Sequence, residues 1–289
     1  MSELVAVGVG IFGALIGSFL NVVVYRVPAG RSIVSPPSAC MGCGQQIRGY
    51  DNIPVLSWLV LRGKCRGCRA GISVRYPLVE LGTAVFFGVV AWWGVSGGLA
   101  ATLRDGRFAI PQGTELAGAE LAALVLAIVA FLWLAGVSVA LALIDLDTKR
   151  LPNVIVLPSY LVGGALLAAS SILIGNYSAL ITAGIGLVAM WVAYYLMAIA
   201  YPGGMGFGDV KLAGVLGLYL GWLGWGPLAV GAFSAFLLGG FFSLALLLAR
   251  RADRKSGIPF GPWMLAGAWL GIFFGESIWT AYLTLYGLA

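Results

Sequence analysis

Residues 121–142 read LAALVLAIVAFLWLAGVSVALA and contain no charged side chain. A helix needs about 20 consecutive apolar residues to cross the hydrocarbon core of a bilayer, so this stretch predicts a transmembrane helix. The whole chain is 61% hydrophobic and only 10% charged, whereas soluble domains carry about 25% charged residues. The sequence therefore predicts an integral membrane protein.

Similar apolar runs recur along the chain and predict an all-α, polytopic bundle of about eight transmembrane helices. The predicted helices cover residues 3–25, 77–98, 115–146, 154–174, 178–200, 209–223, 226–249 and 260–287. The sixth is short and rich in glycine. The first has neither a basic start nor an Ala-x-Ala site, so we expect it to be a permanent helix. We expect three parts, namely a first transmembrane helix (1–25), a polar loop domain (26–76) and a transmembrane core (77–289).

The basic residues predict which side of the membrane the loops occupy. Eight passes place four loops on one side, residues 26–76, 147–153, 201–211 and 250–259. These loops hold 15 of the 17 Lys and Arg residues, and only Arg104 and Arg107 fall on the other side. Basic loops mark the cytoplasmic side, so both termini are expected outside. The net charge of +6 then reflects topology and contact with anionic lipid in the bilayer, and it requires no nucleic acid.

All four cysteines lie in the polar loop domain, in two CxxC motifs separated by 21 residues: Cys40, Cys43, Cys65 and Cys68. Paired CxxC turns hold zinc because each short turn directs two thiolates at one tetrahedral ion. Disulfides would not persist in a reducing cytoplasm, and a redox motif would not need a second copy. The sequence predicts a structural zinc that staples the loop domain and performs no chemistry.

The chain contains no histidine. This excludes a Ser-His-Asp triad, an HExxH zinc site and a histidine proton relay. Acid–base chemistry must therefore come from carboxylates, Cys, Lys or Tyr. There are eleven carboxylates, and the topology places Glu115, Glu120 and Glu276 toward the outer side.

The carboxylates near the cytoplasmic ends of predicted helices are Glu80, Asp145, Asp147 and Asp209. A charged side chain costs roughly 3 kcal/mol at the centre of a membrane helix, so such residues are candidates for function. Asp209 could instead cap its helix, and Asp145 and Asp147 could be interfacial acids facing Lys149 and Arg150.

Asp145 and Asp209 come from distant segments but are predicted at the same depth on the same side. Residues 201–208 (YPGGMGFG) are too rich in glycine to continue a helix, and broken backbone at membrane depth lies beside protein or a water-filled cavity. Two close carboxylates share one proton, so one can activate water while the other polarises a carbonyl. We therefore expect these residues to form the catalytic pair of an aspartic peptidase.

Several motifs make the chain resemble the type IV prepilin peptidase family, the leader peptidases of the GxGD intramembrane aspartic class. The similar stretches are residues 17–26 (GSFLNVVVYR), 52–58 (NIPVLSW), 75–80 (RYPLVE), Asp145 with Pro152 and Asn153, 206–211 (GFGDVK) and 259–262 (PFGP). Their order along the chain follows that of the family. The resemblance implies that Asp145 and Asp209 are catalytic and that Gly206, Gly208 and Lys211 support them, with Asp147 as a possible alternative to Asp145.

The resemblance also implies a reaction. The enzyme would remove the basic leader of type IV prepilins or type II secretion pseudopilins by cutting after glycine, at the cytoplasmic face of the bacterial inner membrane. Members with the cysteine loop also methylate the new N-terminus with S-adenosylmethionine. The transmembrane core (77–289) would then be the peptidase core.

Two competing hypotheses are a secondary transporter, which would have ionisable groups at the midplane of the membrane, and a methyltransferase without peptidase activity. The recognition of a basic leader is a separate question, because the cytoplasmic face is itself basic. Asp51, Glu80, Asp253 or lipid could supply the negative charge.

Overall fold

The computed structural model describes residues 2–99, 118–201, 205–249 and 259–287. The predicted start of the third helix, with Glu115, lies outside these ranges. So do Arg104 and Arg107, the basic cluster at 250–255 with Asp253, and part of the glycine-rich stretch 201–208.

The described residues form an all-α structure, which confirms the predicted fold class. Its long helices are α1 Ser2–Arg26, α3 Arg75–Ser96, α5 Ala119–Thr148, α6 Asn153–Leu173, α7 Tyr177–Ala200, α8 Phe207–Leu223, α9 Trp225–Leu248 and α10 Gly261–Leu285. Between α1 and α3 the chain adds a short 3-10 helix, η1 Gly49–Asn52, and the short helix α2 Leu56–Val60. Each of the eight predicted helices therefore has a counterpart among the described residues.

Six of these helices, α1, α3, α5, α6, α7 and α9, are long and apolar enough to cross a membrane. Helix α8 has only 17 residues, which rise about 26 Å and fall short of the bilayer core of about 30 Å. Helix α10 has 25 residues but is not among the six. The chain is a membrane protein, and the expectation of about eight spanning helices is approximate.

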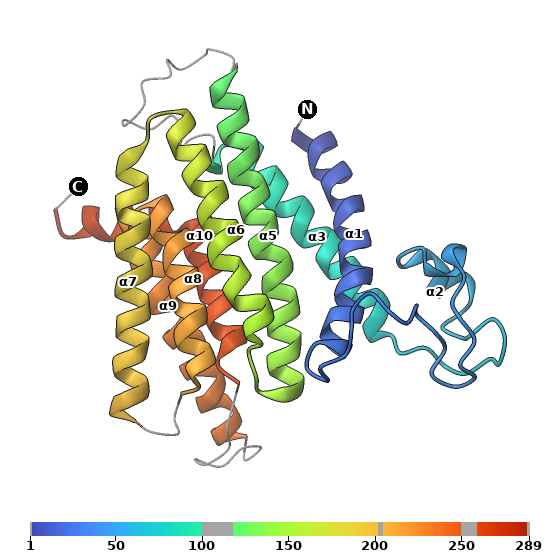
Figure 1. The fold of residues 1–289 in the computed structure, drawn as a ribbon. Coiled ribbons are helices and arrows are strands. Elements are labelled where there is room, and N and C mark those ends of the chain that lie inside the picture. The colour runs from blue at the N-terminus through green and yellow to red at the C-terminus, as the bar shows by residue number, and fades with distance from the viewer. Residues whose placement is uncertain (1, 100–117, 202–204, 250–258, 288–289) are drawn as a thin grey trace.

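The long helices run alternately up and down (Figure 1). The last turns of α1, α5, α7 and α9 and the first turns of α3, α6, α8 and α10 lie at one end of the bundle, drawn at the bottom. The α1–α3 pair lies at one side, and the loop with α2 projects outward from it. This arrangement puts the ends of α5 and α8 that carry Asp145 and Asp209 on one side of the molecule.

Glycines allow the closest helix contacts in the bundle. A Cβ on Gly217 of α8 would lie 2.2 Å from the carbonyl oxygen of Gly186 on α7, and a Cβ on Gly267 of α10 would lie 2.4 Å from the amide nitrogen of Ala235 on α9. Membrane helices associate through such small residues because lipid offers no hydrophobic driving force between them. These contacts position α8 and α10, whose first turns reach the acidic residues.

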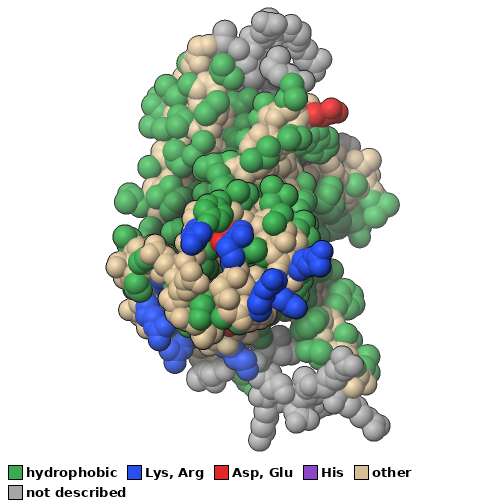
Figure 2. Space-filling view, turned by 90° about the vertical axis from the view of Figure 1, so that its right-hand side faces the viewer, with side chains coloured by type: hydrophobic (Ala, Val, Ile, Leu, Met, Phe, Trp, Pro, Cys, Tyr) green, Lys and Arg blue, Asp and Glu red, His purple; other side chains and the backbone are tan. Residues whose placement is uncertain are grey.

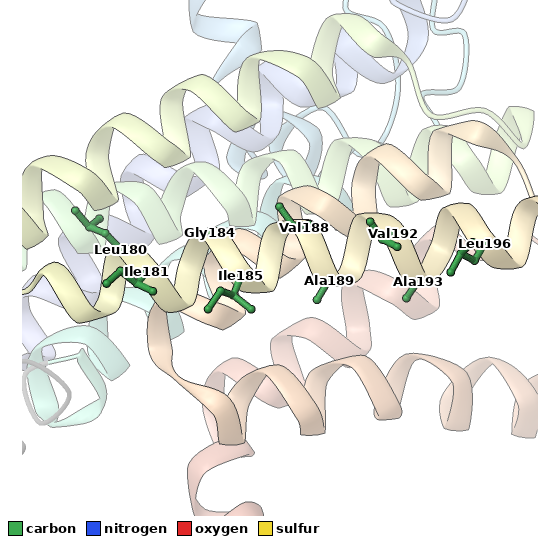
Figure 3. A pocket seen from close by; sticks show the side chains of 9 residues that line it. All are labelled: Leu180, Ile181, Gly184, Ile185, Val188, Ala189, Val192, Ala193 and Leu196. Carbon is green, nitrogen blue, oxygen red and sulfur yellow. The ribbon is translucent and has the colours of Figure 1, made fainter.

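The opposite face of α7 is an apolar stripe (Figure 3). This side of α7 alone lines a shallow hollow. The lining residues are Leu180, Ile181, Gly184, Ile185, Val188, Ala189, Val192, Ala193 and Leu196. Such a surface suits acyl chains, and none of its members is a candidate site residue.

We predict that Gly186→Val destabilises the protein, whereas Gly184→Val leaves its stability nearly unchanged. A Cβ on Gly186 would lie 2.4 Å from the carbonyl oxygen of Gly217, but nothing lies within 4 Å of a Cβ on Gly184. Overpacking of this kind costs about 1–3 kcal/mol. Thermal unfolding of both variants in the same detergent measures the difference, and equal midpoints would show that this contact does not hold α7 against α8.

Candidate active site and metal centre

Asp145 lies in the last turn of α5 and is only 4% exposed. Its Oδ2 accepts a hydrogen bond from the backbone N–H of Gly261, the first residue of α10, at 3.0 Å. A Cβ at position 261 would lie 2.7 Å from that oxygen, so only glycine lets the backbone approach so closely. The buried carboxylate is thus fixed by a residue 116 positions away in the chain.

Asp209 is half-buried in the first turn of α8. The helix begins at Phe207, two residues before the predicted start, so Asp209 is its third residue. Its Oδ2 accepts a hydrogen bond from the backbone N–H of Gly206 at 3.0 Å, as an acid at this position of a helix often does. Asp209 therefore stabilises the helix start as its third residue and not as the N-cap, which is Gly206. Among the described residues its Oδ1 makes no hydrogen bond.

Leu151 packs between the two helix starts that lie next to the acids. It lies in the turn between α5 and α6 and meets the first turns of both α8 and α10. A Cβ on Gly208 would lie 3.0 Å from the Leu151 Cβ, and one on Gly261 would lie 3.3 Å from its Cδ2. Gly208 directly precedes Asp209 and Gly261 holds Asp145, so Leu151 packs against the neighbours of both acids. The ends of α5, α8 and α10 thus form one site.

Asp147 has a different partner. Its carboxylate forms a two-point ion pair with the guanidinium of Arg75, with oxygen–nitrogen distances of 2.5 and 3.1 Å. Its side chain is 40% exposed. Arg75 is the first residue of α3, so this ion pair joins the start of α3 to the end of α5.

Lys211, two residues after Asp209, is held by a polar contact with Asn153 at the start of α6. Its Nζ donates a hydrogen bond to Asn153 Oδ1 at 2.9 Å and lies 4.9 Å from the centre of the Phe207 ring. The Tyr160 hydroxyl donates to the Lys211 carbonyl oxygen at 2.5 Å. These contacts join the first turn of α8 to α6 on the side where the acids lie.

Of the carboxylates considered for recognition of a basic leader, Asp51 and Glu80 have partners within the protein. Asp51 forms an ion pair with Arg66 at 2.6 Å, and this guanidinium lowers the pKa of the Asp51 carboxyl. Glu80 is buried, and its Oε2 accepts a hydrogen bond from the Val55 N–H at 2.7 Å. Glu120 lies in the first turn of α5, at the far end of the helix from Asp145.

The cysteine loop domain, residues 27–74, brings its four thiols together. The ligand sulfurs of Cys40, Cys43, Cys65 and Cys68 all lie within 4.8 Å of one another. The Sγ atoms of Cys40 and Cys68 are 3.7 Å apart, close to the spacing of about 3.8 Å between sulfurs in a tetrahedral ZnS₄ centre. The four cysteines are therefore positioned to bind a metal ion, as predicted.

The two CxxC turns have the same backbone geometry. The Cys40 N–H donates to the Gln45 carbonyl and the Cys65 N–H to the Ala70 carbonyl, at 2.9 and 2.8 Å. The Gly42 N–H donates to the Cys40 sulfur at 3.4 Å, and this bond is the main cause that lowers the pKa of the Cys40 thiol to about 6. A thiolate is the form that binds metal.

Basic side chains gather on the outer face of the cysteine loop domain (Figure 2). In this view the Lys and Arg side chains lie around the loop domain in the lower half of the molecule, whereas hydrophobic side chains dominate the upper half. This segregation agrees with a domain that lies at a membrane surface.

Gly261 and Leu151 are site residues to which the sequence analysis gave no role. The stretch 259–262 was recognised only as part of a resemblance, and Leu151 had no motif. The position of Gly261, inside a recognised motif and at the start of a predicted helix, is the sequence feature that could have indicated its role. Leu151 is an ordinary apolar residue and offered none.

Two family profiles match the chain. Residues 11–94 match the bacterial peptidase A24 N-terminal domain, and residues 128–247 match the type IV leader peptidase family. The first segment contains the four cysteines and Arg75, and the second contains both candidate aspartates.

Similar proteins match the chain almost end to end. A prepilin leader peptidase/N-methyltransferase of Aeromonas hydrophila is 36% identical over 95% of this chain and 92% of its own length. Proteins of the same name in Aeromonas salmonicida and Pseudomonas aeruginosa are 37% and 34% identical. They cover 95% and 96% of this chain and 92% and 93% of their own lengths. No solved structure matches the chain.

We predict that Glu80→Ala loosens the cysteine loop domain, whereas Glu80→Gln does not. The alanine leaves the Val55 amide without its acceptor, which costs about 1–3 kcal/mol, while the glutamine carbonyl can still accept. Limited trypsin digestion should cut the alanine variant faster within residues 27–74, at sites such as Arg62 and Lys64. Equal cutting of both variants would contradict a tethering role for Glu80.

Proposed function

The chain belongs to the type IV leader peptidase family, and on that premise we propose that Asp145 and Asp209 are its catalytic carboxylates. The protein is a membrane peptidase of the prepilin leader peptidase/N-methyltransferase type, which removes the leader of prepilins and methylates the new N-terminus. One observation supports the proposed pair above all others. Two acids from α5 and α8 meet at the same end of the bundle, and each is fixed by the backbone amide of a glycine.

The chemistry follows from two neighbouring carboxyl groups that share one proton. The ionised carboxylate takes a proton from water, and the water oxygen forms a bond to the scissile carbonyl carbon. The protonated carboxyl hydrogen-bonds the carbonyl oxygen. The C–N bond then breaks as the leaving amine takes a proton from the pair. The shared proton belongs to the pair, so we assign neither aspartate alone as the acid.

We propose Asp145 rather than Asp147 as the partner of Asp209. Both are near the end of α5, but residues two apart point to different faces of a helix. Asp145 is buried against α10, whereas Asp147 forms its ion pair with Arg75 at the surface. Both carboxylate oxygens of Asp147 are occupied by the Arg75 guanidinium.

Zinc is the metal we propose for the four cysteines. The spacing of the thiols fits tetrahedral sulfur coordination, and four thiolates would leave no open position for a substrate. The ion would hold the two CxxC turns together and would take no part in hydrolysis. Glu80 ties the domain to α3, and Arg75 ties the start of α3 to the end of α5. Loss of the ion should therefore disturb the nearby helix ends.

We place the active site at the cytoplasmic face of the bacterial inner membrane, because the basic loops share that end of the bundle. The substrates would be prepilins or pseudopilins cut after glycine, and anionic lipid would supply countercharge for the basic leader. S-adenosylmethionine is the methyl donor, and the described residues mark no site for it. Nucleic acid has no part in the proposal.

We predict that Asp145→Asn and Asp209→Asn each reduce leader cleavage by roughly 10³-fold, the order expected when a general base is lost. Asp147→Asn should keep most of the activity, because an exposed ion pair contributes only about 0–1 kcal/mol. The measurement is cleavage of a precursor with a basic leader, glycine at the cut site and an apolar helix, read by mass spectrometry.

Mass analysis of the same products reports any added methyl group. Cleavage at the normal rate by Asp209→Asn would reject the aspartic mechanism. If Asp147→Asn lost cleavage and Asp145→Asn stayed active, Asp147 and not Asp145 would be the catalytic partner of Asp209.

We also predict one zinc ion per chain in the purified protein. Cys65→Ser should remove most of the zinc, because one ligand of a four-thiolate site is lost. Ser57→Ala, in the same domain but outside the thiol cluster, should keep it. Metal analysis of wild-type protein and both variants provides the test, and a wild type without zinc would overturn the assignment.

A further inference from the structure

Tyr194 on α7 has a buried hydroxyl group whose role is unexplained by packing. The residue is only 1% exposed, and its hydroxyl has no hydrogen-bond partner among the described residues. Two other largely buried tyrosines have partners: the Tyr219 hydroxyl donates to the Ala130 carbonyl at 3.0 Å, and that of Tyr160 donates to the Lys211 carbonyl. A buried polar group without a partner is destabilising, so its presence calls for an explanation.

The surroundings of Tyr194 place it at the proposed active site. Its ring centre lies 6.3 Å from that of Phe260 and 5.4 Å from that of Phe236. Phe260 immediately precedes Gly261, whose amide holds Asp145. The Tyr194 ring therefore packs against the residue that leads into the contact between Gly261 and Asp145, at the end of the bundle that carries both acids.

We propose that Tyr194 is a third catalytic residue, whose hydroxyl donates a hydrogen bond to the oxygen of the scissile carbonyl. This inference rests on the proposed aspartic mechanism. When water attacks, the electron pair of the C=O double bond moves onto oxygen, and a donor directed at that oxygen stabilises the resulting negative charge. The hydroxyl keeps its proton, so the proton balance of the two carboxylates is unchanged.

This role explains why the hydroxyl has no partner among the described residues. A donor already bonded to a backbone carbonyl could not respond to the charge that develops on the substrate. A donor held by ring packing and kept away from water is ready for that charge without reorganisation. The rings of Phe236 and Phe260 supply that packing, and they would be unaffected by loss of the oxygen.

The test compares Tyr194→Phe with Tyr219→Phe, since each removes a single buried oxygen. Tyr194→Phe should lower kcat by about 100-fold with little change in KM, as for loss of a donor that acts only in the transition state. Its thermal midpoint should stay equal or rise, because a desolvated polar group has been removed. Tyr219→Phe should show the reverse, with normal kcat and a lower midpoint, because it loses a bond to Ala130.

Three results would overturn the proposal. Tyr194→Phe could cleave the precursor at the wild-type rate, its midpoint could fall as that of Tyr219→Phe does, or its defect could lie in KM alone. The first removes the catalytic role, the second shows that the hydroxyl has a structural partner, and the third shows that it acts in binding. Asp209→Asn, assayed in parallel, separates this from the aspartic mechanism: if that variant is active, the mechanism itself fails whatever Tyr194→Phe does.

Discussion

The arrangement depends on two backbone amides, those of Gly206 and Gly261, which each hold one carboxylate at the end of a membrane helix bundle. An acid in such a place is costly unless hydrogen bonds compensate for the lost water. An amide compensates without adding a positive charge, so the carboxylate keeps its capacity to exchange protons. The absence of a side chain at Gly261 is what allows α10 to begin directly against Asp145. Leu151 then fills the space between the starts of α8 and α10.

The same end of the bundle contains a second, structural set of charges. Asp147 and Glu80 both hold the cysteine loop domain or its neighbouring helix start, through Arg75 and the Val55 amide. Asp145 and Asp147 are two residues apart, so the helix directs one into the bundle and the other toward the surface. A transporter would place its ionisable groups at the midplane of the membrane. Here Asp145 and Asp209 lie in the last turn of α5 and the first turn of α8, which favours chemistry on a substrate that arrives from one side.

Much of this could be predicted from the sequence, because a bilayer imposes long apolar helices and basic loops on one side. The helices follow from those constraints, the thiol cluster follows from the spacing of the two CxxC motifs, and the importance of carboxylates follows from the absence of histidine. The contact between Gly261 and Asp145 does not, since it joins residues 116 positions apart and leaves no local pattern. Tyr194 was also missed, because a tyrosine in an apolar helix looks like an ordinary packing residue until its hydroxyl is found without a partner. The start of α8 was placed two residues late because the glycines before Asp209 suggested a loop.

The proposed mechanism requires Asp145 and Asp209 to act as one unit on the same peptide bond. The most direct measurement is the residual cleavage rate of the double variant Asp145→Asn/Asp209→Asn beside both single variants. Groups that work as a unit are strongly non-additive, because removing either one already abolishes their joint contribution. We expect the double variant to be no slower than the slower single variant. A double variant whose defect equals the product of the two single defects would contradict it.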